Sequence, residues 1–231
     1  MKKIDFHLHT ISTRRDSDFT FNLDVLKRYT SECGIDAIAI TNHDVFDADQ
    51  YRTIEEALEI QVYPGIEVSL ENGHLLIISE RASIDDFQDR TSHITERITE
   101  ASETISVTDL KGISTDLSEY LVIPHYEKKP ALSRNIINEI SEDIVAGEVD
   151  SAKKFIRATK DTDKLTPVLF SDARINDEME SFPTRQTFIE CGELSLDAIK
   201  TCLRDKNKVA LSDTDGNTLF QVFDNGLYIS T

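Results

Sequence analysis

The sequence of 231 residues is poor in cysteine and in long apolar runs. Its three cysteines, Cys33, Cys191 and Cys202, form no Cys-x-x-Cys pair, which argues against a disulfide framework and a cysteine-type zinc site. We expect them to be reduced and structural. The longest apolar runs are only strand-sized, and residues 1–3 lead directly into a polar, histidine-containing segment. We therefore expect a cytoplasmic protein with no secretory signal and no membrane partner.

Positive charge is also scarce, because 25 lysines and arginines face 43 aspartates and glutamates, giving a formal net charge of -18. The electrostatic field of so acidic a protein repels a polyanion, which works against non-specific binding to nucleic acid. Divalent ions bound in a cleft would reverse the charge locally and admit a phosphate group. This balance favours a small phosphorylated molecule over long duplex DNA, although a nucleotide or a nucleic-acid end remains an expected class of substrate.

The chain has no visible internal repeat, no low-complexity tract and no G-x-x-x-x-G-K-[ST] motif, so we expect no P-loop binding of ATP. The composition, with 39% hydrophobic and 29% charged residues, is that of an ordinary globular protein. The length allows one large α/β domain or two small ones. We favour a single domain over residues 1–231, in which residues 213–231 lead towards a following domain.

Short β-rich runs alternate with helical patterns, which is typical of a parallel α/β architecture. The expected strands are 4–9, 36–42, 62–70, 74–79, 121–125 and 167–171, with further candidates at 144–149, 186–190, 208–212 and within 219–228. The expected helices are 23–33, 49–58, 84–101 and 195–203. The polar stretch 83–120 predicts either two helices or a mobile excursion over the site.

Five of the six histidines stand at or just beyond predicted strands: His7, His9, His43, His74 and His125. Residues two apart in a strand share a face, so His7 and His9 can ligate one metal ion. A single His-x-His is a weak signal, because two satisfied histidines would look the same. The sixth, His93, lies in a polar helical stretch and is expected to be a surface residue without chemistry.

Polar residues of the metal-ligating kind recur where other predicted strands stop, at His43, Glu67, His125 and Asp172. In a barrel of parallel strands the C-terminal ends converge on one mouth, so these side chains should meet despite their sequence separation. Imidazole nitrogens and carboxylate oxygens suit zinc, manganese or iron, and such a shell with open positions is typical of hydrolytic sites.

These residues stand in an ordered set of motifs that resembles the PHP (polymerase and histidinol phosphatase) domain. The motifs are 5–10 (DFHLHT), 41–44 (TNHD), 64–68 (PGIEV), 73–74 (GH) and 124–125 (PH). The resemblance spans nearly the whole chain. It implies a distorted (β/α)7, TIM-like α/β barrel with two or three divalent ions that hydrolyses phosphate esters.

The resemblance also implies a set of ligands. The first ion would be held by His7, His9, Glu67 and Asp172. The second would be held by Glu67, His74 and His125, so that Glu67 bridges the pair.

In the family pattern His43 would ligate a third ion. This sequence departs from the family in the other ligands of that ion. The usual histidine after Ser-Asp-x is replaced by Arg174, and the first loop, residues 12–18, offers arginines and aspartates but no histidine. A guanidinium has no lone pair for a metal, so Arg174 either abolishes the third ion or substitutes its own charge for it. We favour substitution, with Arg174 and Arg15 binding the substrate phosphate. The alternative is an arginine paired with a nearby acid in a decayed site.

The roles of His43 and Asp44 stay open at this point. His43 could ligate an ion or could protonate the leaving oxygen. Asp44 could orient a ligating histidine as its hydrogen-bond acceptor or could cap a helix. Lys128, Lys129 and Arg185 are candidate phosphate contacts, but such charges are more often solvated surface groups.

Other classes compete with the phosphoesterase. A metal-dependent amidohydrolase also begins with His-x-His, but its pattern implies a ligating lysine in mid-barrel, where this chain offers Glu67 and His74. A stronger alternative is a non-catalytic, metal-binding regulatory domain beside an ATPase, which Arg174 and a truncated chain would favour. Residues 186–190 and 196–200 resemble the end of PHP domains that precede SMC-like or AAA-like ATPases. A purely structural barrel would leave the placement of the histidines unexplained.

Overall fold

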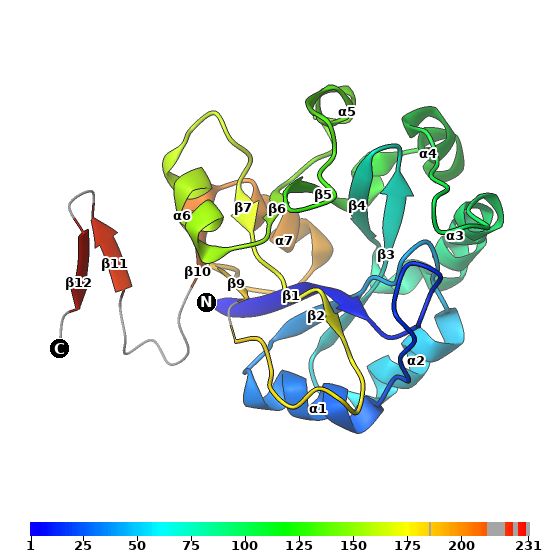
Figure 1. Ribbon diagram of the computed structural model, residues 1–231, viewed down its shortest axis with the longest axis horizontal. Helices are drawn as coiled ribbons and strands as arrows, with labels where there is room; N and C mark the ends of the chain where they lie inside the picture. The colour runs from blue at the N-terminus through cyan, green and yellow to red at the C-terminus, as the bar shows by residue number, and fades with distance from the viewer. Residues whose placement is uncertain (185, 212–219, 224–225, 230–231) are drawn as a thin grey trace.

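A computed structural model describes residues 1–184, 186–211, 220–223 and 226–229. In this part of the chain a ten-stranded sheet curves into a nearly closed barrel (Figure 1). The order is β10-β9-β1-β2-β3-β4-β5-β6-β7, with β8 paired to β1. The strands are β1 (Lys2–His9), β2 (Ala37–Ile40), β3 (Gln61–Leu70), β4 (Gly73–Ile78), β5 (Leu121–Glu127), β6 (Gly147–Val149), β7 (Pro167–Val168), β8 (Ala173–Arg174), β9 (Thr187–Ile189) and β10 (Val209–Leu211). This architecture confirms the predicted distorted, TIM-like α/β barrel.

The helices surround the sheet in Figure 1, and most begin at a polar cap. They are α1 (Leu23–Glu32), α2 (Ala48–Ala57), α3 (Ile84–Arg97), α4 (Val107–Ser114), α5 (Arg134–Glu139), α6 (Ala152–Lys160) and α7 (Leu196–Leu203). The stretch 83–120 thus contains two helices, which confirms one of the two alternatives. The predicted helix over 84–101 ends early, at Arg97, and Ser106 starts α4 with a capping box. Helices α5 and α6, which are short and bury few residues, were not predicted.

The sheet is not wholly parallel, in contrast to the expected architecture. Strand β4 is antiparallel to both β3 and β5, and β9 is antiparallel to β1. Only two residues join β3 to β4, and Glu71 there has a φ of +47°, so the connection is a tight hairpin with no crossover helix. As a result His74, at the start of β4, pairs with Ser69 and lies at the same rim as the end of β3.

Side chains help to join the last strands to the first. Strand β7 ends at Val168, earlier than the predicted strand over 167–171. Beyond it, the backbone N–H of Leu169 donates to Thr187 Oγ1 at 2.8 Å, and Thr187 Oγ1 donates to the Leu169 carbonyl at 3.0 Å. The N–H of Ser171 donates to Asp5 Oδ1 at 3.0 Å. These bonds bring Asp172 to β1.

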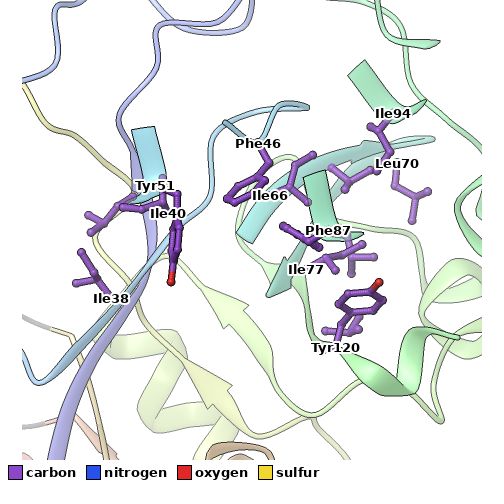
Figure 2. Close-up of a cluster of buried hydrophobic side chains, with 14 of the residues drawn as sticks. Ile38, Ile40, Phe46, Tyr51, Ile66, Leu70, Ile77, Phe87, Ile94 and Tyr120 are labelled. Atoms are coloured by element: carbon purple, nitrogen blue, oxygen red, sulfur yellow. The ribbon is translucent and has the colours of Figure 1, made fainter. Parts of the chain in front are cut away.

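Apolar side chains form two buried clusters, and alternate residues of the strands divide between them, as expected for a sheet covered on both faces. In β2, Ile38 and Ile40 join the first cluster while Ala37 and Ala39 join the second. Figure 2 shows part of the first cluster, where strand residues meet side chains of α2 and α3. Those labelled there are Ile38, Ile40, Phe46, Tyr51, Ile66, Leu70, Ile77, Phe87, Ile94 and Tyr120.

The predicted strands within 219–228 correspond to an antiparallel hairpin of β11 (Phe220–Phe223) and β12 (Gly226–Ile229). Residue 212, the predicted end of another strand, lies outside the described residues, as do 213–219. That residues 213–231 lead into a following domain stays a prediction. Among the described residues, no helix combines the length and the apolar character needed to cross a membrane.

Candidate metal centre

Four side-chain atoms surround one point at the mouth of the barrel. They are His7 Nε2, His9 Nε2, Glu67 Oε2 and Asp172 Oδ1. Glu67 Oε2 lies 3.0 Å from the His7 nitrogen and 3.4 Å from the His9 nitrogen. Asp172 Oδ1 lies 3.4 Å and 3.1 Å from the same two atoms. Ligands bound at about 2.1 Å with angles between 90° and 110° are roughly 3.0 to 3.4 Å apart, so these four atoms have the spacing of one coordination shell.

The second oxygen of Glu67 faces two other histidines. Oε1 lies 2.6 Å from His74 Nδ1 and 3.1 Å from His125 Nε2. The three side chains are buried, and their ligand atoms lie within 4.8 Å of one another. Glu67 therefore turns one oxygen towards each of two groups of histidines, which is the arrangement of a carboxylate that bridges two ions.

Buried nitrogens without hydrogen bonds test whether this centre suits cations. Within the described part of the chain, His43 Nδ1 and His125 Nε2 are buried and lack a hydrogen-bond partner. Each lies close to an oxygen of Glu67, at 3.0 and 3.1 Å, but without hydrogen-bond geometry. An unsatisfied buried polar atom costs about 1 to 3 kcal/mol. A shared cation would satisfy these lone pairs, so the residues fit a multi-metal centre.

The protonation states of Glu67 and His9 suit bound cations, whereas His7 carries a proton in their absence. Burial raises the pKa of Glu67, but the adjacent His7 and His125 outweigh it and hold that pKa well below its usual value. Burial lowers the pKa of His9 to about 4, so its ring is neutral at pH 7. Burial also lowers the pKa of His7, but the carboxylates of Glu148 and Glu67 reverse this and raise it to about 10. His7 must release a proton when it ligates an ion.

A bulge in β1 explains why its polar residues reach different neighbours. The register with β2 shifts between Asp5 and Leu8, so one extra residue of β1 lies between them. His7 and His9 both reach the centre, as predicted, whereas Asp5 accepts hydrogen bonds from Tyr29 and Ser171. Asp5 thereby fixes the backbone next to Asp172, whose φ of +53° is uncommon for a residue with a side chain.

The segment 41–44 ties the rim together through its side chains. Thr41 Oγ1 accepts from the N–H of Leu8 at 3.2 Å, and Asn42 Oδ1 accepts from the N–H of Thr10 at 2.6 Å. These bonds hold the end of β1 against the end of β2. His43 follows, and its ring nitrogen Nδ1 reaches Glu67.

Asp44 does not orient a ligating histidine, nor does it cap a helix. Its Oδ1 accepts from the N–H of Ser69 at 2.6 Å, and its Oδ2 accepts from Ser69 Oγ at 2.7 Å and from Arg15 Nε at 2.9 Å. Asp47 caps α2 instead. The left-handed backbone of Asp44, with φ +55°, turns its carboxylate towards β3. Both expected roles of Asp44 are therefore corrected: it holds β3 and Arg15 in place.

The glycines of two motifs stand where backbones approach closely. A Cβ at Gly65 would come within 2.8 Å of Thr41 Cγ2 and 3.1 Å of the Ile40 carbonyl oxygen. A Cβ at Gly73 would come within 2.5 Å of the Leu132 backbone nitrogen. Glycine at these two positions lets β3 lie close to the end of β2 and lets the start of β4 lie close to the segment after β5.

Arg174 lies beside His43, at the place where the family pattern has a further histidine. Its Nε donates to Asp16 Oδ1 at 2.9 Å, its Nη1 bonds to Asp172, and its Nη2 lies 3.2 Å from His43 Nε2. Asp16 Oδ1 is 3.9 Å from the same His43 nitrogen. The arginine thus occupies the space between His43 and two acids, and its side chain is one third exposed.

A cleft of about 320 Å³ opens beside His43. The loop after β1 and the segment after α3 line it, with Ile11, Val45 and Ile98 among the apolar side chains and Arg14 and Arg15 among the cations. The predicted phosphate contact Arg15 therefore lies at the cleft, but its guanidinium is paired with Asp44 and the Glu103 carbonyl oxygen.

Glu148 belongs to the centre, although the sequence analysis missed it. Parallel pairing of β5 with β6 places Glu148 beside His125, and the buried carboxylate lies 3.0 Å from His7 Nδ1 and 3.2 Å from His125 Nε2. A ligating imidazole commonly donates its other N–H to a carboxylate. A lone acid within the apolar run 144–149 was the available signal.

Glu148→Gln should weaken metal binding by about 10- to 100-fold, because the acceptor that orients the His7 ring would lose its negative charge. Competition with a chromogenic chelator measures this affinity. Glu142→Gln, at an exposed position on the same segment, is the matched control. An unchanged affinity in Glu148→Gln would show that Glu148 does not support His7.

The lysines after β5 also differ from expectation. Lys128 is buried at 7% exposure and bonds to Glu148, so its description as a solvated surface group is wrong. Lys129 is exposed, and Arg185 lies outside the described residues. His93, with a side chain 60% exposed, is a surface residue as predicted.

Comparisons with known proteins support the fold. Neither models of protein families nor curated proteins match the sequence. Among solved structures, a two-domain protein of Bacteroides vulgatus that contains a predicted PHP-like metal-dependent phosphoesterase matches with a TM-score of 0.59 at 18% identity. The match covers 92% of this chain and 65% of that one, so this chain spans less than two thirds of the length of that protein.

Two more distant structures also match. A predicted metal-dependent phosphoesterase of Bifidobacterium adolescentis has a TM-score of 0.47 at 14% identity, over 87% of this chain and 96% of its own. An amidohydrolase of Chromobacterium violaceum has a TM-score of 0.42 at 13% identity, over 78% and 92%. The Bacteroides match shows that this chain is similar in fold to a PHP-like protein. This chain's own structure brings together His, Glu and Asp groups that could hold metal ions.

Proposed function

We propose that the protein is a metal-dependent phosphoesterase whose centre is built around Glu67. One observation carries the proposal: the two oxygens of Glu67 face different histidines. Oε2 lies 3.0 Å from His7 Nε2, and Oε1 lies 2.6 Å from His74 Nδ1. Divalent ions held there would lower the pKa of water towards neutrality and neutralise charge on a phosphate group. Zinc, manganese and iron all accept these nitrogen and oxygen ligands.

The protein's own residues supply binding and orientation. His7, His9 and Asp172 would hold one ion with Glu67. His74 and His125 would hold the other. His43 stands between this centre and the cleft, where it could complete a shell through Nδ1 or pass a proton to the leaving oxygen.

Arg174 is proposed to stand in for a third ion. Its contacts with Asp16, Asp172 and His43 fix a guanidinium at the edge of the centre, so a positive charge remains where the family pattern expects a metal. A fixed cation there would stabilise charge that develops on the phosphate in the transition state. Arg15 would contribute a further positive charge at the cleft.

The cleft and the charge balance support a small phosphorylated molecule or nucleotide as substrate. A volume of about 320 Å³ lies at the lower end of the range for small-molecule sites. The net charge of -18 repels a long polyanion. A nucleic-acid end is the other member of the proposed class, since only its terminal nucleotide has to enter.

Metal removal tests the proposal. The chelated protein should hydrolyse neither a generic phosphomonoester nor a phosphodiester, and added Mn²⁺ should restore one of these activities. His9→Gln should abolish the restored activity, whereas the matched surface variant His93→Gln should retain it. Absence of hydrolysis with Mn²⁺, Zn²⁺ and Fe²⁺ alike would contradict the proposal.

A further inference from the structure

Lys128 is a buried cation inside a centre that is otherwise arranged to receive cations. It directly follows β5, and its side chain is 9% exposed. Lysine is among the residues least often buried unless it is paired. Its neighbour Lys129 is exposed, so burial of Lys128 is specific to this position.

The ammonium group of Lys128 binds one oxygen of each of two carboxylates. Nζ donates to Glu148 Oε1 at 2.8 Å and lies 2.9 Å from Asp172 Oδ2. It also lies 2.9 Å from His7 Nδ1. The Lys128 ammonium group, just after β5, thus contacts both β6 and the segment before β8.

The other oxygen of each carboxylate faces the histidines. Asp172 Oδ1 lies 3.1 Å from His9 Nε2, and Glu148 Oε2 lies 3.2 Å from His125 Nε2. Asp172 is therefore divided between the lysine at Oδ2 and imidazole nitrogens at Oδ1, which also accepts from Arg174. Glu148 Oε1 binds the lysine and lies 3.0 Å from His7 Nδ1, whereas Oε2 is the oxygen that faces His125. Lys128 binds one oxygen of each carboxylate. That oxygen is then not free to bind the metal ion together with the other one.

We propose that Lys128 is a positioning residue that makes Asp172 and Glu148 present one oxygen each to the metal centre. This inference rests on the metal centre of the proposed function. It has a consequence for metal selectivity. Calcium takes six to eight oxygen ligands and often binds carboxylates through both oxygens, whereas manganese, iron and zinc accept imidazole with single carboxylate oxygens. Lys128 should therefore disfavour calcium.

Two simpler roles predict different results. If Lys128 only balanced charge, its removal would strengthen the binding of all divalent ions alike. If it only supported the fold, its removal would lower thermal stability and weaken all ions alike. Only a role in positioning the carboxylates changes the ratio of the dissociation constants for Ca²⁺ and Mn²⁺.

The test is calorimetric titration of the chelated full chain with Ca²⁺ and with Mn²⁺. Lys128→Met should shift the ratio of the two dissociation constants towards Ca²⁺ by about tenfold, the lower end of what a partner of a metal ligand contributes. Lys129→Met, the exposed control, should leave the ratio unchanged. If Lys128→Met does not fold, Lys128→Gln, which is shorter and also uncharged, replaces it in the titration. The same shift in the ratio of dissociation constants is expected.

The outcomes separate this inference from the proposed function. An unchanged ratio in a folded Lys128 variant overturns the role of Lys128, even if the wild type hydrolyses phosphate esters. A shifted ratio supports that role, even if the wild type hydrolyses none, in which case the proposed function alone fails. A wild-type chain that binds neither ion overturns the inference.

Discussion

Glu67→Gln should reduce metal-dependent hydrolysis roughly a thousandfold, equivalent to about 4 kcal/mol of transition-state stabilisation. The carboxylate lies within 3.4 Å of His7, His9, His43, His74 and His125. An amide of the same size keeps one oxygen, but it loses the charge and turns an N–H₂ group towards one set of imidazoles. Metal content should fall from about two ions per chain to one or none, because a single oxygen cannot serve both groups of ligands.

Elemental analysis and initial rates with added Mn²⁺ measure the two effects together. Glu56→Gln, an exposed position on α2, is the matched control and should behave as the wild type. A Glu67→Gln protein that retains about two ions and hydrolyses at the wild-type rate would show that Glu67 does not bridge them.

Arg174→Ala should lower hydrolysis about a hundredfold, equivalent to about 3 kcal/mol, while the metal content stays the same. The guanidinium contacts His43, Asp16 and Asp172, but it is not one of the groups that could ligate a metal. Loss of the guanidinium should therefore weaken the stabilisation of the phosphate more than the binding of the metal ions. Arg174→Lys should recover only part of the rate, because an ammonium group lacks the planar fork.

Arg174→His tests the same idea in the opposite direction. An imidazole at this position, beside His43 Nε2 and Asp16, should allow one additional ion to bind per chain. Elemental analysis measures the difference. If Arg174→Ala hydrolyses as fast as the wild type, the arginine merely pairs with acids in a decayed third site, and the proposed substitution of charge for metal is wrong.

Much of the centre could be predicted because it follows from strand periodicity. His7 and His9 alternate along one strand, and His43, Glu67 and His125 stand near strand ends, so one rule of barrel topology brings them together. The sequence analysis placed His74 in the same group, although it begins a strand. The structure explains this placement by the hairpin of β3 and β4, which reverses the direction of β4.

The residues that were missed depend on long-range pairing. Glu148 enters the centre because β6 pairs with β5 in a register that places it next to His125, and no local pattern fixes that register. Lys128 is buried because Glu148 and Asp172 neutralise it, and these partners are 20 residues or more away along the chain. Asp44 was misinterpreted because its positive φ redirects the carboxylate to Ser69.

The most direct test of the central claim is anomalous X-ray diffraction from a crystal grown with Mn²⁺ or Zn²⁺. Two anomalous peaks are expected on either side of the Glu67 carboxylate, one among His7, His9 and Asp172 and the other between His74 and His125. Each peak should lie about 2.0 to 2.2 Å from its ligand atoms. A map with no peak at the mouth of the barrel, or with a single peak that Glu67 does not contact, would contradict the central claim.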